Sequence, residues 1–324
     1  MEVSSALETF VPPRDGVVLT IGNFDGVHLG HVQIINTARS VAQRFGSTVV
    51  VLTFDPHPLA ILAPERAPAQ LTLPAEKLAL LARCHVKRGI VLRTDPTLLA
   101  RTAEDFLASL VAHCRPRAFV EGPDFTFGHG RSGSVETLRR HAEHWGYEVH
   151  QVPALHCETL STHPTISSSS IRQALVDGRV DEANAMLGRP YCIVGTIGHG
   201  AGRGDGLGFP TANLTGIQHL LPQQAVYAAV AQLEDGTFHL TAVNIGPQPT
   251  FAEDTVRVEA FLLDFAGNLR GQRIALHFLD RLREQTRFAD ADALVAQIKR
   301  DVAETRAYEG MVQQLARGHV LSLM

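Results

Sequence analysis

The stretch Gly22-Asn23-Phe24-Asp25-Gly26-Val27-His28-Leu29-Gly30-His31 decides the fold of the first half of the chain. The apolar run before it, at 17–21, predicts a buried strand. A helix is predicted after it, because apolar side chains recur on one side: Val32, Ile34, Ile35 and Ala38. His28 and His31 therefore lie at a strand-to-helix corner, where they share one face of the first helical turn.

This corner has the properties of an anion site. Glycines on both sides allow a bulky ligand to approach the backbone. The N-terminus of a helix attracts anions, and an imidazole there can donate a hydrogen bond to phosphate. The corner is thus predicted to bind the triphosphate of a nucleotide; the alternative is a glycine-rich turn that carries two surface histidines.

The stretch resembles the His-x-Gly-His signature of the nucleotidylyltransferases, which move a nucleoside monophosphate from a triphosphate onto a phosphorylated acceptor. Its longer form, Gly-Asn-Phe-Asp-Gly-Val-His-x-Gly-His, resembles that of the prokaryotic bifunctional riboflavin kinase/FAD synthetases. The resemblance implies that His28 and His31 are catalytic. It also implies that five neighbours bind the nucleotide: Gly22, Asn23, Phe24, Asp25 and Gly30.

Length and composition fit a soluble two-domain protein. The chain has 324 residues, of which 45% are hydrophobic and 19% charged. A net charge of −4 gives no support for binding to nucleic acid. No signal peptide or membrane-length apolar run is seen, so we expect a cytoplasmic protein without membrane contact. Four dispersed cysteines favour reduced thiols rather than a metal site: Cys84, Cys114, Cys157 and Cys192.

The first half alternates short apolar runs with helical patterns. Strands are predicted at 17–22, 48–54, 89–93, 117–121 and 147–153, and helices near 29–45, 76–84, 102–114 and 134–145. Such alternation predicts the α/β class, with a parallel sheet covered by helices on both faces and ligands beyond the carboxyl ends of the strands. The resemblance implies a Rossmann-like nucleotidylyltransferase domain, the FMN adenylyltransferase, at 1–187.

The pattern changes near residue 188. Turn residues crowd 195–208, and β-type runs follow at 225–233, 238–245, 255–264 and 272–279. They predict a compact antiparallel β-barrel, closed by an amphipathic C-terminal helix near 290–307. The resemblance implies a riboflavin kinase domain at 188–324. The segment 311–324 is left unassigned.

Three further segments of the first half resemble the family: Thr53-Phe54-Asp55-Pro56-His57-Pro58, Gly122-Pro123-Asp124-Phe125-Thr126-Phe127-Gly128 with Arg131, and Ile166-Ser167-Ser168-Ser169-Ser170-Ile171-Arg172. The resemblance implies cofactor binding by His57, Asp124, Phe125, Arg131, Ser168 and Ser169, with Arg172 catalytic. Each segment has an alternative: an ordinary loop, aromatic packing, and helix capping by serine, respectively.

These parts imply a first reaction. ATP and Mg²⁺ bind at the corner, the phosphate of FMN attacks the α-phosphorus in line, and pyrophosphate leaves. The acceptor phosphate is already ionised at neutral pH, so positioning and charge neutralisation are the protein's task. His28 and His31 hold the phosphates, and Arg172 holds the departing pyrophosphate through its planar, charged guanidinium.

The second half contains Leu207-Gly208-Phe209-Pro210-Thr211-Ala212-Asn213, which resembles the Gly-Phe-Pro-Thr-Ala-Asn motif of riboflavin kinases. The resemblance implies that Thr211 and Asn213 bind Mg²⁺ and that Gly208, Pro210 and Asn244 bind the nucleotide. It implies further that Glu259 is the base for the ribityl 5′-hydroxyl; the alternative is a solvated strand charge. There is no Walker-type sequence.

This half also departs from the family pattern. Asp205 stands where relatives carry arginine, and Gln248 where they often carry arginine. Ala225 replaces glycine, Phe261 histidine, and Arg270 tyrosine. The motifs of both halves together lead us to expect a bifunctional enzyme with riboflavin, FMN and ATP as substrates. Three alternatives stay open: an FAD synthetase with an inactive kinase half, a nucleotidylyltransferase for another acceptor, and a non-enzymatic flavin sensor. Oligomeric state is not predicted.

Overall fold

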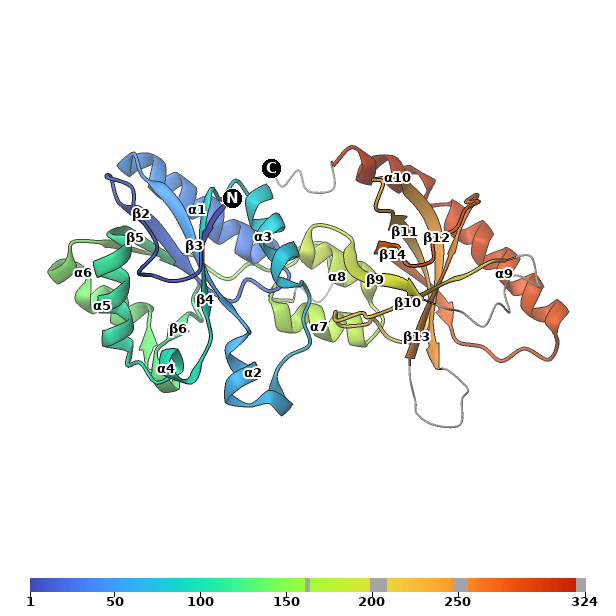
Figure 1. Ribbon diagram of the computed structural model, residues 1–324, viewed down its shortest axis with the longest axis horizontal. Helices are drawn as coiled ribbons and strands as arrows, with labels where there is room; N and C mark the ends of the chain where they lie inside the picture. The colour runs from blue at the N-terminus through green and yellow to red at the C-terminus, as the bar shows by residue number, and fades with distance from the viewer. Residues whose placement is uncertain (161–163, 199–208, 248–255, 319–324) are drawn as a thin grey trace. The chain divides into compact units, whose positions relative to one another are not determined.

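The computed structural model describes residues 1–160, 164–198, 209–247 and 256–318 (Figure 1). They form two compact units. The first holds the described residues 1–158 and 164–166, and the second holds 159–160 and those from 167 onward.

The first unit is built on a six-stranded sheet in the order β1-β4-β3-β2-β5-β8. All neighbouring strands are parallel. The strands are β1 (Glu2–Ser4), β2 (Val17–Ile21), β3 (Thr48–Asp55), β4 (Arg88–Arg93), β5 (Pro116–Glu121) and β8 (Glu148–Gln151). The predicted parallel sheet is confirmed. Strand β1 was not predicted, because three mostly exposed residues are too few to show an alternating apolar pattern.

Helices cover both faces of this sheet (Figure 1). Alternate residues of each strand face opposite sides, so Val18 and Val49 pack with α1 (Leu29–Phe45), whereas Leu19 and Val50 pack with α5 (Ala103–Cys114) and α6 (Val135–Trp145). The chain also forms α3 (Pro74–Arg83) and short elements: α2 (Pro58–Leu62), η1 (Pro64–Arg66), α4 (Pro96–Leu99), β6 (Thr126–Phe127), η2 (His129–Arg131) and β7 (Gly133–Ser134). The order of β2 and β5 places a topological switch point between their carboxyl ends.

The second unit is a closed barrel in the order β10-β13-β12-β11-β14-β9, with antiparallel neighbours throughout. Its strands are β9 (Tyr191–Gly198), β10 (Ala212–Thr215), β11 (Ala225–Gln232), β12 (Phe238–Pro247), β13 (Val256–Leu262) and β14 (Arg273–Glu284). The predicted antiparallel barrel is confirmed. Strands β9 and β10, on either side of the turn-rich segment, were not among the predicted strands.

Two helices precede the barrel and belong to the same unit: α7 (Ser168–Val176) and α8 (Val180–Leu187). Asn184 on α8 donates from Nδ2 to the carbonyl oxygen of Phe278 at 2.9 Å, and its Oδ1 accepts from the backbone N–H of Tyr191 at 2.7 Å. The compact units therefore divide before α7, whereas the expected functional domains divide at 187/188. That functional boundary stays a prediction.

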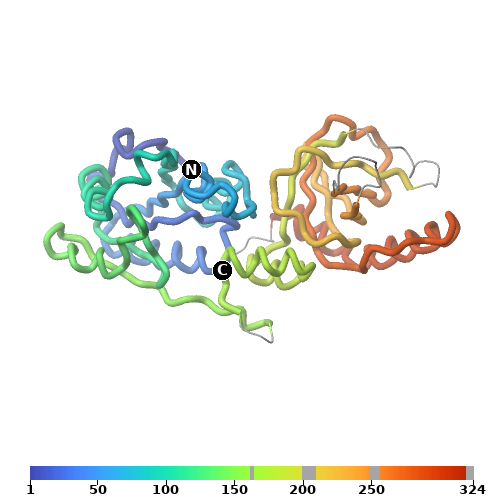
Figure 2. The backbone as a smooth tube through the Cα atoms, turned by 90° about the horizontal axis from the view of Figure 1, so that it is seen from below, coloured from blue at the N-terminus to red at the C-terminus, as the bar shows by residue number. Residues whose placement is uncertain are grey.

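Two helices follow the barrel and lie along it, α9 (Ala291–Arg306) and α10 (Glu309–Ala316) (Figure 2). Arg283 on β14 makes a two-pronged ion pair with the buried Asp301 of α9, at 2.8 Å for each bond. Met311, Val312 and Leu315 of α10 pack with the apolar cluster of the barrel. The predicted C-terminal helix is confirmed, and α10 accounts for part of the segment that was left unassigned. In the parts of the chain that the structure describes, no helix is both long and apolar enough to span a membrane.

Candidate active sites

The corner between β2 and α1 brings its two histidines into contact. Their rings stack, with centroids 3.6 Å apart and an interplanar angle of 19°. His28 is the N-cap of α1, and its Nδ1 accepts from the backbone N–H of His31 at 3.3 Å. Phe24 lies against His31 at a centroid distance of 5.0 Å. The pair thus lies at the first turn of the helix, beyond the carboxyl end of β2, as the sequence predicts.

The tight backbone of this corner explains two of its residues. A Cβ on Gly30 would lie 3.1 Å from the His28 ring and 3.4 Å from the carbonyl oxygen of Ile166, so a larger residue would push the imidazole away. The Asp25 carboxylate accepts hydrogen bonds from the N–H groups of Leu71 and Thr72, and from the Thr72 hydroxyl. Asp25 therefore holds the 71–72 loop against the corner.

Asn23 and His57 join the carboxyl ends of β2 and β3. The Asn23 side-chain nitrogen lies 3.0 Å from His57 Nε2. His57 caps α2, since its Nδ1 accepts from the backbone N–H of Leu59 at 3.1 Å. Both residues line a small cavity of about 30 Å³, together with Asp25, Phe54, Asp55 and Lys77 among others. The structure thus brings two residues from separate predicted motifs to one place.

Lys77 of α3 is a residue that the sequence analysis missed. Its ammonium is buried and donates to the carbonyl oxygen of Asn23 at 3.1 Å, to Thr53 Oγ1 at 3.1 Å and to the carbonyl oxygen of Phe54 at 3.4 Å. Burial lowers the pKa of Lys77, and the nearby carboxylates of Asp25 and Asp55 oppose that shift. The available signal was its spacing: Lys77 lies four residues before the buried Leu81, on the same helix face.

Glu121 is the second missed residue. It ends β5, its side chain is buried, and Oε1 accepts from the backbone N–H of Ile21 at 2.9 Å. The β2–β5 pairing continues only to Leu19 and Phe119, so the carboxyl replaces a backbone carbonyl where the two strands part. Burial raises the pKa of Glu121 well above its ordinary value. A lone acid at the end of an apolar run was the signal in the sequence.

The 122–131 segment lies after β5 and is mainly packed by its aromatic residues. Phe127 is buried and stacks with Phe125 at a centroid distance of 5.3 Å. Arg131 donates from Nε to Thr126 Oγ1 at 2.9 Å, and Asp124 is exposed. The roles of Asp124, Phe125 and Arg131 toward a nucleotide stay predictions.

The serine-rich segment begins α7, in the second unit. Ser167 is the helix cap, because its hydroxyl accepts from the backbone N–H of Ser170 at 3.1 Å. Ser168 and Arg172 are half-buried, and Ser169 is exposed. Capping thus accounts for Ser167, and the predicted roles of Ser168, Ser169 and Arg172 remain predictions.

In the barrel, the strand register places three predicted residues in one row. Glu259 of β13 pairs with Asn213 of β10 on one side and with Asn244 of β12 on the other. Directly opposite residues share a face of a sheet, with Cβ atoms about 5 Å apart. Val258 and Ala260 are buried inside the barrel, so the Glu259 side chain lies on the outer face, where 30% of it is exposed.

Polar neighbours surround this row. Gln285 donates from Nε2 to Asn244 Oδ1, and Arg257 Nη1 lies 3.9 Å from Glu259 Oε1. Asn213 is buried, with 8% exposed. A carboxylate flanked by two amides can accept a proton from a hydroxyl held between them. Gly208 was also expected here but lies outside the described residues, as do Asp205 and Gln248.

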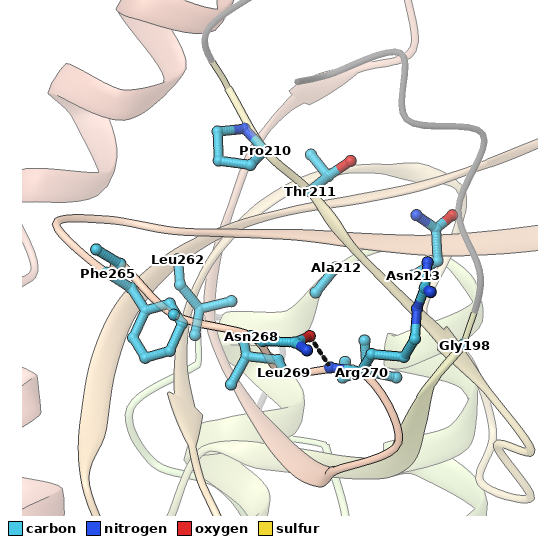
Figure 3. Close-up of a pocket in the computed structure, with 13 residues that line it drawn as sticks. Gly198, Pro210, Thr211, Ala212, Asn213, Leu262, Phe265, Asn268, Leu269 and Arg270 are labelled. Atoms are coloured by element: carbon cyan, nitrogen blue, oxygen red, sulfur yellow. Dashed lines mark hydrogen bonds between the residues drawn. The ribbon is translucent and has the colours of Figure 1, made fainter. Parts of the chain in front are cut away.

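Beside the row lies a cavity of about 480 Å³, lined by Pro210, Thr211, Asn213 and the 265–270 loop among others (Figure 3). Leu262 and Phe265 form an apolar end, and Thr211, Asn213 and Arg270 form a polar end. The described residues contain no group of three or more His, Cys, Asp or Glu side chains able to hold a metal. The oxygen donors of Thr211 and Asn213 fit Mg²⁺, which keeps few protein ligands and takes its others from phosphates and water.

Comparison with known proteins finds a matching family for each half of the chain. A family profile described as FAD synthetase matches residues 12–169, and one described as riboflavin kinase matches residues 187–309. The bifunctional riboflavin kinase/FMN adenylyltransferase of Escherichia coli (strain K12) is 38% identical over 93% of this chain and 95% of its own length. The same-named protein of Pseudomonas fluorescens is 35% identical over 95% of this chain and 97% of its own.

Among solved structures, the crystal structure of a protein described as a macrolide-efflux protein from Streptococcus pneumoniae matches with a TM-score of 0.83. It is 30% identical to this chain, and the match covers 94% of this chain and 98% of that one. The two family profiles match successive parts of the chain, and the two relatives are similar to it over almost their full length. The chain therefore belongs to the family of bifunctional riboflavin kinase/FMN adenylyltransferases.

Proposed function

We propose that this chain phosphorylates riboflavin to FMN and then adenylylates FMN to FAD, with ATP as the co-substrate of both steps. The observation that carries the proposal is that chemically suitable residues gather at two places, the β2–α1 corner of the first unit and the outer face of the barrel in the second. The first unit has the stacked His28 and His31 at a helix N-terminus. The second has Glu259 between Asn213 and Asn244.

In the adenylyl step, His28 and His31 hold the triphosphate of ATP and donate hydrogen bonds to the charge that develops on it. Asn23 and His57 position the nucleotide from the ends of β2 and β3. Lys77 and Glu121 are positioning residues, because they fix the strand end that carries the corner from its two sides. The resemblance assigns the departing pyrophosphate to Arg172, with Ser168 and Ser169 as further donors, and these residues begin α7 of the second unit.

In the kinase step, Glu259 takes the proton from the terminal ribityl hydroxyl as that oxygen attacks the γ-phosphorus, and ADP leaves. Asn213 and Asn244 orient the hydroxyl and the carboxylate. Thr211 and Asn213 would hold Mg²⁺, which neutralises the phosphate charge when bound. The nucleotide occupies the adjoining cavity of about 480 Å³. We assign both reactions to the cytoplasm, where ATP is available.

Product analysis tests this proposal. The full chain is incubated with ATP, Mg²⁺ and either riboflavin or FMN, and the flavins are separated by chromatography. FAD from both substrates is the expected result. FAD from FMN alone would leave an FAD synthetase with an inactive kinase half, and flavin binding without any product would leave a sensor.

A further inference from the structure

The polar end of the large barrel cavity carries a positively charged residue to which none of the sequence motifs gives a role. Arg270 lines this cavity together with Thr211 and Asn213, and its side chain extends toward Asn213 (Figure 3). Among the described residues that line the cavity, Arg270 is the one charged side chain. The cavity therefore has an apolar end at Leu262 and Phe265 and a cationic end at Arg270.

The backbone fixes this arginine in place. Its N–H donates to Asn268 Oδ1 at 3.0 Å, which closes the turn before it (Figure 3). The next residue, Gly271, donates to the carbonyl oxygen of Ile197 on β9 at 2.9 Å, and Leu269 is buried beneath the loop. A guanidinium carried by an anchored backbone loses less freedom when it binds an anion.

The acid of the same loop, Asp264, does not pair with Arg270. Asp264, in the same loop, is engaged by both terminal nitrogens of Arg306 at 2.8 Å each. Within the described parts of the chain, Arg270 has no ion pair, and no carboxylate lines the cavity. Among the described residues no acid competes for this charge, and the planar guanidinium suits two phosphate oxygens of an anionic ligand at once.

We propose that Arg270 binds the phosphate chain of ATP in the kinase reaction, with the base of the nucleotide at the Leu262–Phe265 end. This inference rests on the proposed kinase function. Arg270 stands where the family pattern has tyrosine, so this cation is particular to this chain.

The test compares Arg270→Gln with Arg273→Gln in the full chain. Arg273 is an exposed arginine that does not line the cavity, so its replacement gives the same change in net charge. Arg270→Gln should raise the KM for ATP in riboflavin phosphorylation about 10- to 100-fold, the loss of hydrogen bonds to a charged partner. The KM for riboflavin, and FAD formation from FMN, should stay within about twofold. Arg270→Lys should recover most of the loss, and Arg273→Gln should match the wild type.

Inhibitors identify the part of the nucleotide that Arg270 contacts. ADP should inhibit the Arg270→Gln kinase 10- to 100-fold more weakly than the wild type, whereas adenosine, which lacks phosphate, should inhibit both equally. An unchanged KM for ATP would overturn the inference. So would an equal weakening by adenosine, since Arg270 would then contact the base.

Calorimetric titration with ADP separates this inference from the kinase proposal itself. It measures binding whether or not riboflavin is phosphorylated, and both variants keep the same first unit, so the difference between them reports the barrel site. Weaker binding in Arg270→Gln alone supports the inference even if the wild type makes no FMN. Equal binding in both variants contradicts it.

Discussion

Replacing Glu121 by glutamine should change the pH dependence of stability in the first unit in a defined way. The Glu121 side chain is buried, and its Oε1 accepts the Ile21 N–H at 2.9 Å. Glutamine has nearly the same shape and retains a carbonyl oxygen at that position, so the hydrogen bond survives. The amide cannot ionise, and the desolvation of a buried carboxylate is therefore removed.

The sign of the effect follows from the raised pKa of Glu121. A carboxyl whose pKa is raised by folding contributes full stability below its unfolded pKa of about 4.3, and that contribution is lost as pH rises through the folded pKa. Across this window the wild type should lose about 1.4 kcal/mol per pH unit relative to Glu121→Gln. The two proteins should agree to within about 1 kcal/mol at the acid end, and the variant should be the more stable at neutral pH.

The assay uses the single tryptophan, Trp145, which lies on α6 against the core of the first unit. Denaturant unfolding followed by its fluorescence, from pH 4.5 to 9, reports that unit selectively. Glu65→Gln, at an exposed position, is the control and should differ from the wild type by less than about 0.5 kcal/mol at every pH. A constant difference between wild type and Glu121→Gln over the whole range would refute the reasoning.

Three further predictions concern the two sites. Lys77→Met removes three hydrogen bonds of a buried ammonium, so it should destabilise the first unit by about 2–4 kcal/mol in the Trp145 assay. It should also lower FAD formation more than FMN formation, and equal losses of both activities would contradict a local role. Arg172→Lys keeps the charge but loses the planar fork, so FAD synthesis from FMN should fall measurably; wild-type rates would leave Arg172 as a surface residue. EDTA should stop both reactions and excess Mg²⁺ should restore them, as followed by chromatography; turnover in EDTA would exclude the proposed role of Thr211 and Asn213.

The regular helices and strands could be predicted because burial of one face makes apolar residues recur at regular intervals in the sequence. The strand at 17–21 and the helix at 29–45 match β2 and α1, since both bury one continuous apolar surface. Strands β9 and β10 were missed because they flank a turn-rich segment whose glycines obscure the alternation. Helices α7 and α8 are short, and Asn184 ties α8 to the barrel through tertiary contacts that no local pattern shows.

Some residues of the candidate sites could likewise be predicted from the sequence, and others could not. The position of His28 at the corner could be predicted, because its hydrogen bond is to His31 in the same helical turn. Lys77 and Glu121 could not, because each bonds to a strand end distant in the sequence. Arg270 was noted only as a departure from the family, because its place in the cavity depends on how the barrel closes.

The central claim is that one chain carries two separate active sites, and paired variants test it most directly. His31→Ala should lower FAD formation from FMN by about 100-fold or more while it still makes FMN from riboflavin. Glu259→Gln should make FAD from FMN but almost no FMN from riboflavin. A mixture of the two variants with riboflavin and ATP should therefore produce FAD, because FMN released by one is used by the other. Loss of both activities in either variant, or a mixture that makes no FAD, would contradict the account.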